Sequence, residues 1–71
     1  MISFDVVCRD FSPGTTFYED VYGSRLEFCV IDWPQESGGK VSWKAISSDG
    51  KTTEFLITKG LEHYGPKLYW K

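Results

Sequence analysis

The stretch that decides the fold is residues 40–58, K-V-S-W-K-A-I-S-S-D-G-K-T-T-E-F-L-I-T. Two runs in it alternate between inward and outward positions, and the inward positions are Val41, Trp43, Ala45, Thr53, Phe55 and Ile57. A period of two indicates strands that bury one face. Asp49-Gly50 between the runs is the strongest short-range signal for a β-hairpin. We therefore predict strands over residues 40–46 and 52–58, joined by a tight turn.

A third strand pattern lies just upstream, over residues 25–33. Its alternating apolar positions are Leu26, Phe28 and Val30. Ile31 and Trp33 then add apolar groups on the second face, which is typical of a central strand covered on both sides. Pro34 ends this pattern because proline lacks an N–H donor. Residues 35–39 are polar and glycine-rich, and we expect a loop there.

The first third of the chain is predicted to hold one strand and one short helix. Residues 2–8 alternate apolar and polar groups, which favours a strand, and Pro13-Gly14 marks a turn. Thr16 and Glu19 match a capping box at the start of a helix. Gly23 would end that helix after about two turns. An irregular loop over residues 16–23 is the alternative.

The C-terminal segment is predicted to add a helical turn and an edge strand. Thr58 would cap a turn over residues 59–64, and Gly65 and Pro66 would end it. Residues 67–70 then read as a last edge strand. Together these elements predict a mainly β fold, or α+β if the short helices are counted. We expect a small antiparallel sheet or open barrel of four or five strands with one or two helical turns.

Length and composition set limits on the class of protein. Seventy-one residues, with 17% aromatic side chains, indicate a single domain over residues 1–71 with an aromatic core. This composition excludes intrinsic disorder. No apolar run is long enough to span a membrane, and the first residues do not read as a signal peptide. We therefore expect a cytoplasmic protein without membrane contact.

The reactive side chains do not form a catalytic pattern. Cys8 and Cys29 are the two cysteines, and His63 is the one histidine, which is too few for a four-ligand zinc site. We interpret the cysteines as reduced, buried thiols, with a disulfide or a reactive thiol as the alternatives. His63, between Glu62 and Tyr64, is typical of a surface turn. We expect no enzyme activity, cofactor or metal.

The charge is divided along the chain. Residues 1–39 hold two arginines and seven acidic residues, whereas residues 40–71 hold six lysines and three acidic residues, for a net charge of −2. Such asymmetry suggests a charged partner, although the two halves would cancel if they interleave in the sheet. Aromatic anchors among acidic groups suit a basic protein surface. The predicted protein-binding residues are Tyr18, Glu19, Asp20, Tyr22, Glu27, Asp32 and Trp33.

An alternative function follows from the C-terminal half, where lysines and aromatic residues are interleaved. Small barrels use this mixture to bind single-stranded nucleic acid. The residues of this alternative set are Lys44, Lys59, Tyr64, Lys67, Tyr69 and Trp70. This half has no arginine, which weakens the reading because arginine recognises phosphate better than lysine does. An unpaired edge at residues 67–70 would also allow a homodimer by strand addition.

One segment resembles a known group of proteins. Residues 41–65, V-S-W-K-A-I-S-S-D-G-K-T-T-E-F-L-I-T-K-G-L-E-H-Y-G, are similar to the strand–turn–strand–short helix segment of a family of small uncharacterised bacterial proteins. The shared features are an aromatic residue two positions after a valine, a turn glycine and a Tyr-Gly ending. The resemblance implies a small α+β sheet and no particular activity. A compact, acidic, aromatic-rich chain also resembles small phage proteins that inhibit host factors.

Overall fold

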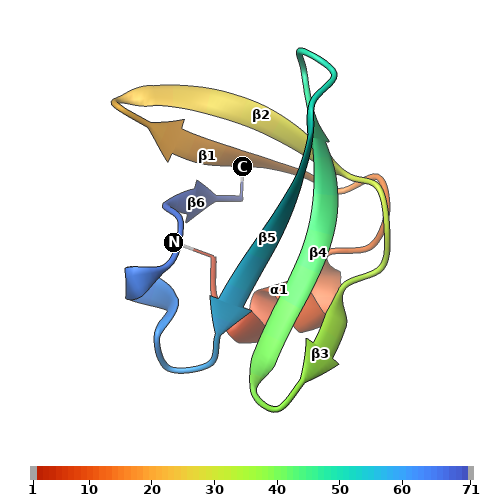
Figure 1. Cartoon of the computed structure of the whole chain (residues 1–71), viewed down its shortest axis with the longest axis vertical. Coiled ribbons are helices and arrows are strands. Elements are labelled where there is room, and N and C mark those ends of the chain that lie inside the picture. Colours follow the sequence, from red (N-terminus) through yellow and green to blue (C-terminus); the bar gives the residue numbers. More distant parts are fainter. Residues whose placement is uncertain (1, 71) are drawn as a thin grey trace.

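A computed structural model describes residues 2–70 of the chain. Within this range the protein is mainly β, with a six-stranded antiparallel open sheet, one short helix and a 3-10 turn (Figure 1). The elements in chain order are α1 (Phe4–Asp10), β1 (Thr16–Val21), β2 (Ser24–Val30), β3 (Gln35–Ser37), β4 (Lys40–Ser47), β5 (Thr52–Thr58), the 3-10 helix (Glu62–Tyr64) and β6 (Leu68–Tyr69). The predicted fold class is confirmed.

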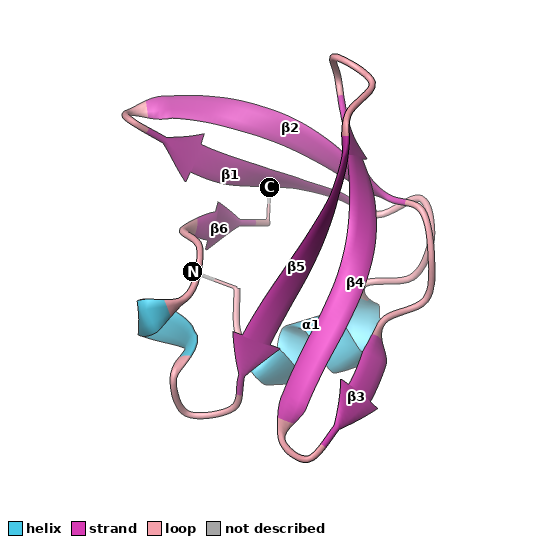
Figure 2. Ribbon diagram, viewed as in Figure 1, coloured by secondary structure: helices cyan, strands magenta, loops and turns pink. Residues whose placement is uncertain are grey.

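Strand β4 organises the sheet because both of its edges are paired (Figure 2). β5 pairs with one edge, in a register that runs from Lys40 opposite Thr58 to Ile46 opposite Thr52. On the other edge, β3 pairs with the first part of β4 and β2 pairs with its last part. β1 pairs with β2, and β6 pairs with β1. β5 and β6 are therefore the two end strands of the main ladder.

The predicted hairpin of residues 40–58 is confirmed as β4 and β5. The side chains of Val41, Trp43 and Ala45 are buried on the inner face of β4, and Phe55 and Ile57 are buried on the same face of β5. The Asp49-Gly50 pair makes the turn, with Gly50 at a φ of 89°. Thr53 shares the inner phase but is exposed, because it lies near the end of the hairpin.

The core is a group of aromatic rings on the inner face of the sheet, supplied by five different segments. These rings are Phe11, Phe17, Phe28, Trp43 and Phe55, and the Phe4 ring and aliphatic side chains such as Val7, Val41 and Leu68 complete the core. Neighbouring ring centroids are 5.0 to 6.0 Å apart, and most pairs meet edge to face. Such pairs add about 0.5–1.5 kcal/mol each beyond the burial of their area. α1 packs against β4 and carries Phe11 into this group at its C-terminal end.

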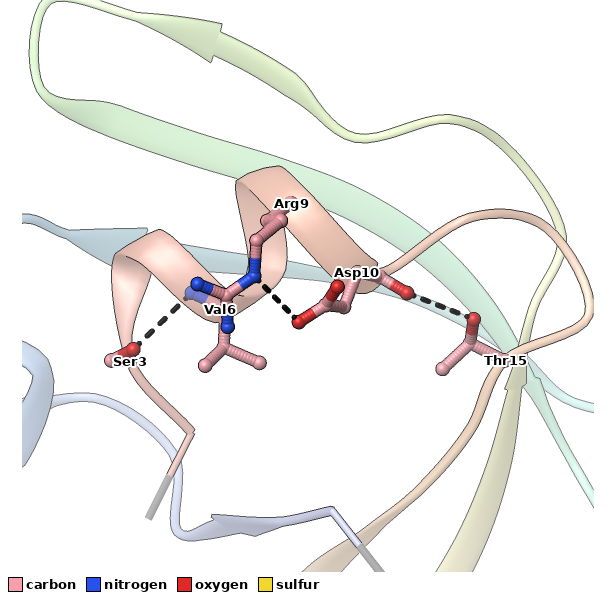
Figure 3. A network of polar contacts seen from close by, with 5 residues as sticks. All are labelled: Ser3, Val6, Arg9, Asp10 and Thr15. Atoms are coloured by element: carbon pink, nitrogen blue, oxygen red, sulfur yellow. Dashed lines mark hydrogen bonds and ion pairs between the residues drawn. The ribbon is translucent and has the colours of Figure 1, made fainter.

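The predicted strand over residues 2–8 is wrong, because this segment forms helix α1. Ser3 caps the helix, with its Oγ accepting a hydrogen bond from the Val6 N–H at 3.2 Å (Figure 3). The Phe4 N–H donates to Glu62 Oε2, 58 positions away, at 3.2 Å. The buried residues Phe4, Val7 and Phe11 have helical spacing, so one helix face covers the core. The sequence fits both patterns, because residues 2–8 alternate while Phe4, Val7 and Phe11 have helical spacing.

The predicted helix over residues 16–23, and its alternative as an irregular loop, are also wrong. The segment forms β1 and a two-residue turn, and Thr16 and Glu19 point to opposite faces instead of forming a capping box. Tyr22 and Gly23 have φ values of 51° and 81°, the signs that a type I′ hairpin turn requires. A two-turn helix is unstable alone, so pairing with residues 24–29 of β2 determines the structure.

Several boundaries also differ from the predictions. β2 is an interior strand as predicted, because it pairs with both β1 and β4, but it ends at Val30. Ile31 beyond it is 45% exposed, so the expected cover on the second face is wrong. Residues 35–39, predicted as a loop, contain β3, which raises the strand count above the four or five expected. The helical turn is confined to Glu62–Tyr64. The edge strand within residues 67–70 is confirmed as β6, paired with β1.

The sheet interleaves the acidic and basic halves of the chain. β2 and β3, from the acidic half, pair with β4 from the basic half, and β6 from the basic half pairs with β1. Strands from the two halves of the chain thus lie side by side within one sheet. Of the two outcomes left open by the charge pattern, the fold produces interleaving.

Candidate functional site

The β1–β2 hairpin carries five of the seven residues predicted to bind a protein, namely Tyr18, Glu19, Asp20, Tyr22 and Glu27. Phe17 points into the core, so its neighbour Tyr18 points outward. Tyr18 is opposite Glu27 on β2, and Asp20 is opposite Arg25. The outer face of this hairpin therefore presents a tyrosine, two carboxylates and one guanidinium group.

Tyr22 occupies the tip of the hairpin, and its side chain is fully exposed. Within residues 2–70 it is the one non-glycine residue with a positive φ. The Gly23 N–H donates a hydrogen bond to Asp20 Oδ1 at 3.0 Å, which holds the turn. A left-handed backbone costs about 1–3 kcal/mol for such a residue, and Asn or Gly is usual in this turn. Packing does not explain a large aromatic residue at this position, so it is a candidate for function.

The Glu19 side chain points to the inner face of the sheet, whereas those of Tyr18 and Asp20 point to the outer face. Glu19 is opposite Leu26 on β2 and Leu68 on β6, and its side chain is half-buried. This burial raises the pKa of the Glu19 carboxyl group above its ordinary value. The structure therefore removes Glu19 from the outward acidic surface that the sequence suggested.

Asp32 and Trp33 lie after β2, at a different part of the molecule from the hairpin tip. Trp33 is 66% exposed, and its backbone N–H donates to Asp32 Oδ1 at 2.9 Å. With Lys44 and Glu54 they line a shallow hollow of about 120 Å³ on the outer face of β4 and β5. The predicted protein-binding set is thus divided between the hairpin and this hollow.

Apolar side chains are exposed around the same hollow. Ile31 donates a backbone hydrogen bond to the Lys44 carbonyl at 3.0 Å, which places it beside β4. Leu56, on the outer phase of β5, is 53% exposed, and Lys44 is opposite Glu54. Sequence reasoning missed Ile31, Leu56 and Glu54 as surface groups. The signal was available, because Leu56 interrupts the polar phase of residues 52–58.

The residues of the alternative nucleic-acid set are spread over separate elements. Lys44 is on the outer face of β4, whereas the Lys59 Nζ lies 5.7 Å from the Phe4 ring centroid, near the start of α1. Tyr64 is exposed on the 3-10 helix. Lys67 and Tyr69 line a hollow of about 230 Å³ together with His63.

The remaining aromatic members of this set are engaged by neighbours. The Arg25 guanidinium lies 4.8 Å from the centroid of the Tyr69 ring, and Tyr69 is opposite Tyr18. The Trp70 ring lies 6.2 Å from the Phe11 ring. A surface that stacks successive bases needs free ring faces beside lysines. The structure instead joins Tyr69 to the β1–β2 hairpin.

The cysteines and the histidine form no reactive constellation. Cys8 and Cys29 are both free; Cys29 is half-buried, but Cys8 is exposed, so the expectation of two buried thiols is wrong for Cys8. Partial burial, with Glu36 and Asp5 nearby, raises the pKa of the Cys8 thiol, which reduces its thiolate fraction. The His63 ring lies 4.0 Å from the Tyr64 ring. In residues 2–70 no group of three metal-ligating side chains is found.

Comparisons of the chain with protein-family models, curated proteins and solved structures find no match. None of the helices in the described range is long and apolar enough to cross a membrane.

Proposed function

We propose that the protein is a non-catalytic binding module that presents the β1–β2 hairpin to another protein, with Tyr22 as the anchor. One observation carries this proposal. A fully exposed tyrosine is held at a φ of 51° in a turn that is stabilised by the hydrogen bond from the Gly23 N–H to the Asp20 carboxylate. Tyrosine offers a large contact area at low entropic cost, and a rigid turn reduces the cost of ordering on binding. The Tyr22 side chain is fully exposed, so packing of the ring does not offset the strain of its backbone.

The charges around the tip indicate the partner's surface. Asp20 and Glu27 project from the outer face of the hairpin, and Arg25, the one cation between them, is drawn toward the Tyr69 ring. An acidic hairpin of this kind favours an apolar pocket with a basic rim, because the charges steer the encounter and the ring supplies the contact area. Binding in such a pocket would inhibit the partner where the pocket is the partner's functional site.

Tyr22→Asn is the variant that tests this proposal. We expect it to raise the free energy of unfolding by about 1 kcal/mol, because asparagine relieves the left-handed strain. We also expect it to weaken partner binding by at least about 30-fold, as the loss of an anchor residue does. Opposite effects on stability and binding separate a functional residue from a structural one.

The measurement compares immobilised wild type, Tyr22→Asn and Tyr64→Asn after incubation with a lysate of the source cells. Tyr64 is the matched control because it is also an exposed tyrosine but lies on the 3-10 helix. A partner retained by wild type and Tyr64→Asn and lost from Tyr22→Asn is then purified for calorimetric titration. If every retained protein binds all three forms equally, the hairpin tip is not the anchor.

A further inference from the structure

β5 has an edge without a strand partner in the described part of the chain. Its seven residues pair with β4 on one side only. The other end strand, β6, has two residues, and β3 has three. Proteins usually protect such edges by making them short, as β3 and β6 are. β5 is therefore the edge long enough to accept another strand.

The backbone groups that face outward along β5 follow from two hydrogen bonds at the ends of the hairpin. Ser47 N–H donates to the Lys51 carbonyl, and Lys59 N–H donates to the Gly39 carbonyl, both at 2.8 Å. Bonded and non-bonded pairs alternate along an antiparallel ladder. Thr53, Phe55 and Ile57 therefore point their backbone groups toward β4, and the even-numbered residues point theirs away.

The outward groups of Thr52 and Glu54 and the N–H of Leu56 are open to a new strand. Thr58 is already engaged, because its carbonyl accepts the Leu61 N–H at 3.0 Å. The Leu56 carbonyl is left out of the open groups because the Gly65 backbone lies near it. The free part of the edge is thus residues 52–56, whose side chains are exposed except that of Phe55.

The side chains along this edge indicate what an added strand would carry. A residue opposite Glu54 would project over the outer face, next to the hollow that Asp32, Glu54 and Lys44 line. The Glu54 carboxylate favours a basic side chain there, and arginine bonds carboxylates best. A residue opposite Leu56 would cover its exposed apolar side chain.

A second copy of this chain fits the edge poorly. The antiparallel register centred on Glu54 would place Glu54 opposite Glu54 of the other copy, and like charges directly opposite each other destabilise a strand pair. One neighbouring register in phase places Glu54 opposite Leu56 and uses the Thr58 carbonyl, which is already bonded. The other places Glu54 opposite Thr52 and leaves Leu56 opposite the turn residue Gly50, so in neither does a cation face Glu54 or an apolar side chain cover Leu56. The edge therefore favours a strand of different sequence.

We infer that β5 accepts an extended segment of another protein as an added antiparallel strand, with an arginine or lysine opposite Glu54 and an apolar residue opposite Leu56. Main-chain bonds to residues 52–56 supply affinity, and these two side-chain positions supply specificity. This surface is distinct from the hairpin tip, so either can fail without the other.

The test uses the synthetic peptide acetyl-Thr-Ile-Val-Arg-Thr-Thr-amide and amide hydrogen exchange by NMR at about 5 mM peptide. In the free protein we expect fast exchange at Thr52, Glu54 and Leu56 and slow exchange at Thr53 and Phe55. The peptide should protect the first three and leave the other two unchanged. Methylation of the arginine backbone nitrogen should abolish this protection, whereas methylation of the valine nitrogen, which faces away, should preserve it.

Charge reversal provides the specificity test. Glu54→Lys should weaken binding of the arginine peptide about tenfold and favour a peptide with glutamate in place of arginine. Glu36→Lys, on the exposed strand β3, is the matched control and should leave both affinities unchanged. The inference is overturned if the even-numbered amides gain no protection or if both methylated peptides bind equally. Protection of those amides without peptide in a concentration-dependent dimer would overturn it in favour of a second copy.

Discussion

Glu19 places an ionisable carboxyl group at a partly buried position on the inner face of the sheet. Its carboxyl group is half-buried between Leu26 and Leu68. Its pKa is raised because burial penalises the charged form. A raised pKa in the folded state means that the folded protein holds the proton more tightly than the unfolded chain. The contribution of Glu19 to stability is therefore greatest at low pH and is lost as the pH rises through the folded-state pKa.

Glu19→Gln should accordingly stabilise the protein, and more so at neutral than at acidic pH. Glutamine keeps the shape of the protonated carboxyl group but does not ionise. We expect the difference in unfolding free energy between variant and wild type to increase from pH 4 to pH 7 in urea titrations. Glu27→Gln, on the outer face of the same hairpin, is the matched control. An equal difference at both pH values would contradict this account of Glu19.

The helix α1 depends on contacts from outside itself. Its seven residues are too few for a stable isolated helix. Its first N–H groups are satisfied by Ser3 and by the Glu62 carboxylate. Hydrogen bonds from its own backbone N–H and from the Phe4 N–H hold the pKa of Glu62 below its ordinary value. The contribution of the Glu62 carboxylate to stability is therefore present above its unfolded-state pKa, and it is lost as the pH falls through the lowered folded-state pKa.

Removing the cap tests how far α1 depends on its N-terminus. Ser3→Ala deletes the acceptor for the Val6 N–H and should lower the free energy of unfolding by about 1 kcal/mol. Ser37→Ala, on exposed β3, should change it by less than about 0.5 kcal/mol. Urea unfolding followed by tryptophan fluorescence measures both. A loss no larger for Ser3→Ala than for Ser37→Ala would show that the cap adds nothing to α1.

For the whole molecule, the aromatic core is the main source of stability. A chain of 71 residues is expected to be stable by only about 4–10 kcal/mol. Trp43, at the centre of β4, is almost fully buried and lies between Phe11, Phe17 and Phe55. One core ring thus supports contacts with α1, β1 and β5 at once.

Trp43→Ala should cost about 3–5 kcal/mol, which is comparable to the total stability. We expect the variant to be largely unfolded at 25 °C, with a loss of near-ultraviolet circular dichroism and of NMR dispersion. Trp33→Ala removes an equally large but exposed ring and should change stability by less than about 0.5 kcal/mol. Similar unfolding curves for the two variants would contradict the assignment of the core.

The candidate site was predictable only in part. Tyr18, Asp20, Tyr22 and Glu27 come together because they are close in the chain and the strand pairing keeps them so. The sequence pattern predicts Glu19 on the same surface, but strand alternation turns it inward. Asp32 and Trp33 belong with Lys44 and Glu54, because β4 lies beside the end of β2. No local pattern encodes that neighbourhood.

By itself, the sequence determined the mainly β class, the β4–β5 hairpin with Trp43 in the core and the terminal edge strand. Each of these depends on local alternation, turn chemistry or chain ends. Tertiary structure alone decided that residues 4–10 are helical and residues 16–21 are a strand. Contacts outside each segment select the conformation: burial of Phe4 and Val7 in the core and the bond to Glu62 for the first, and pairing with β2 and β6 for the second. Tertiary structure also interleaved the acidic and basic halves of the chain, because pairing of β2 with β4 and of β1 with β6 joins strands from opposite halves.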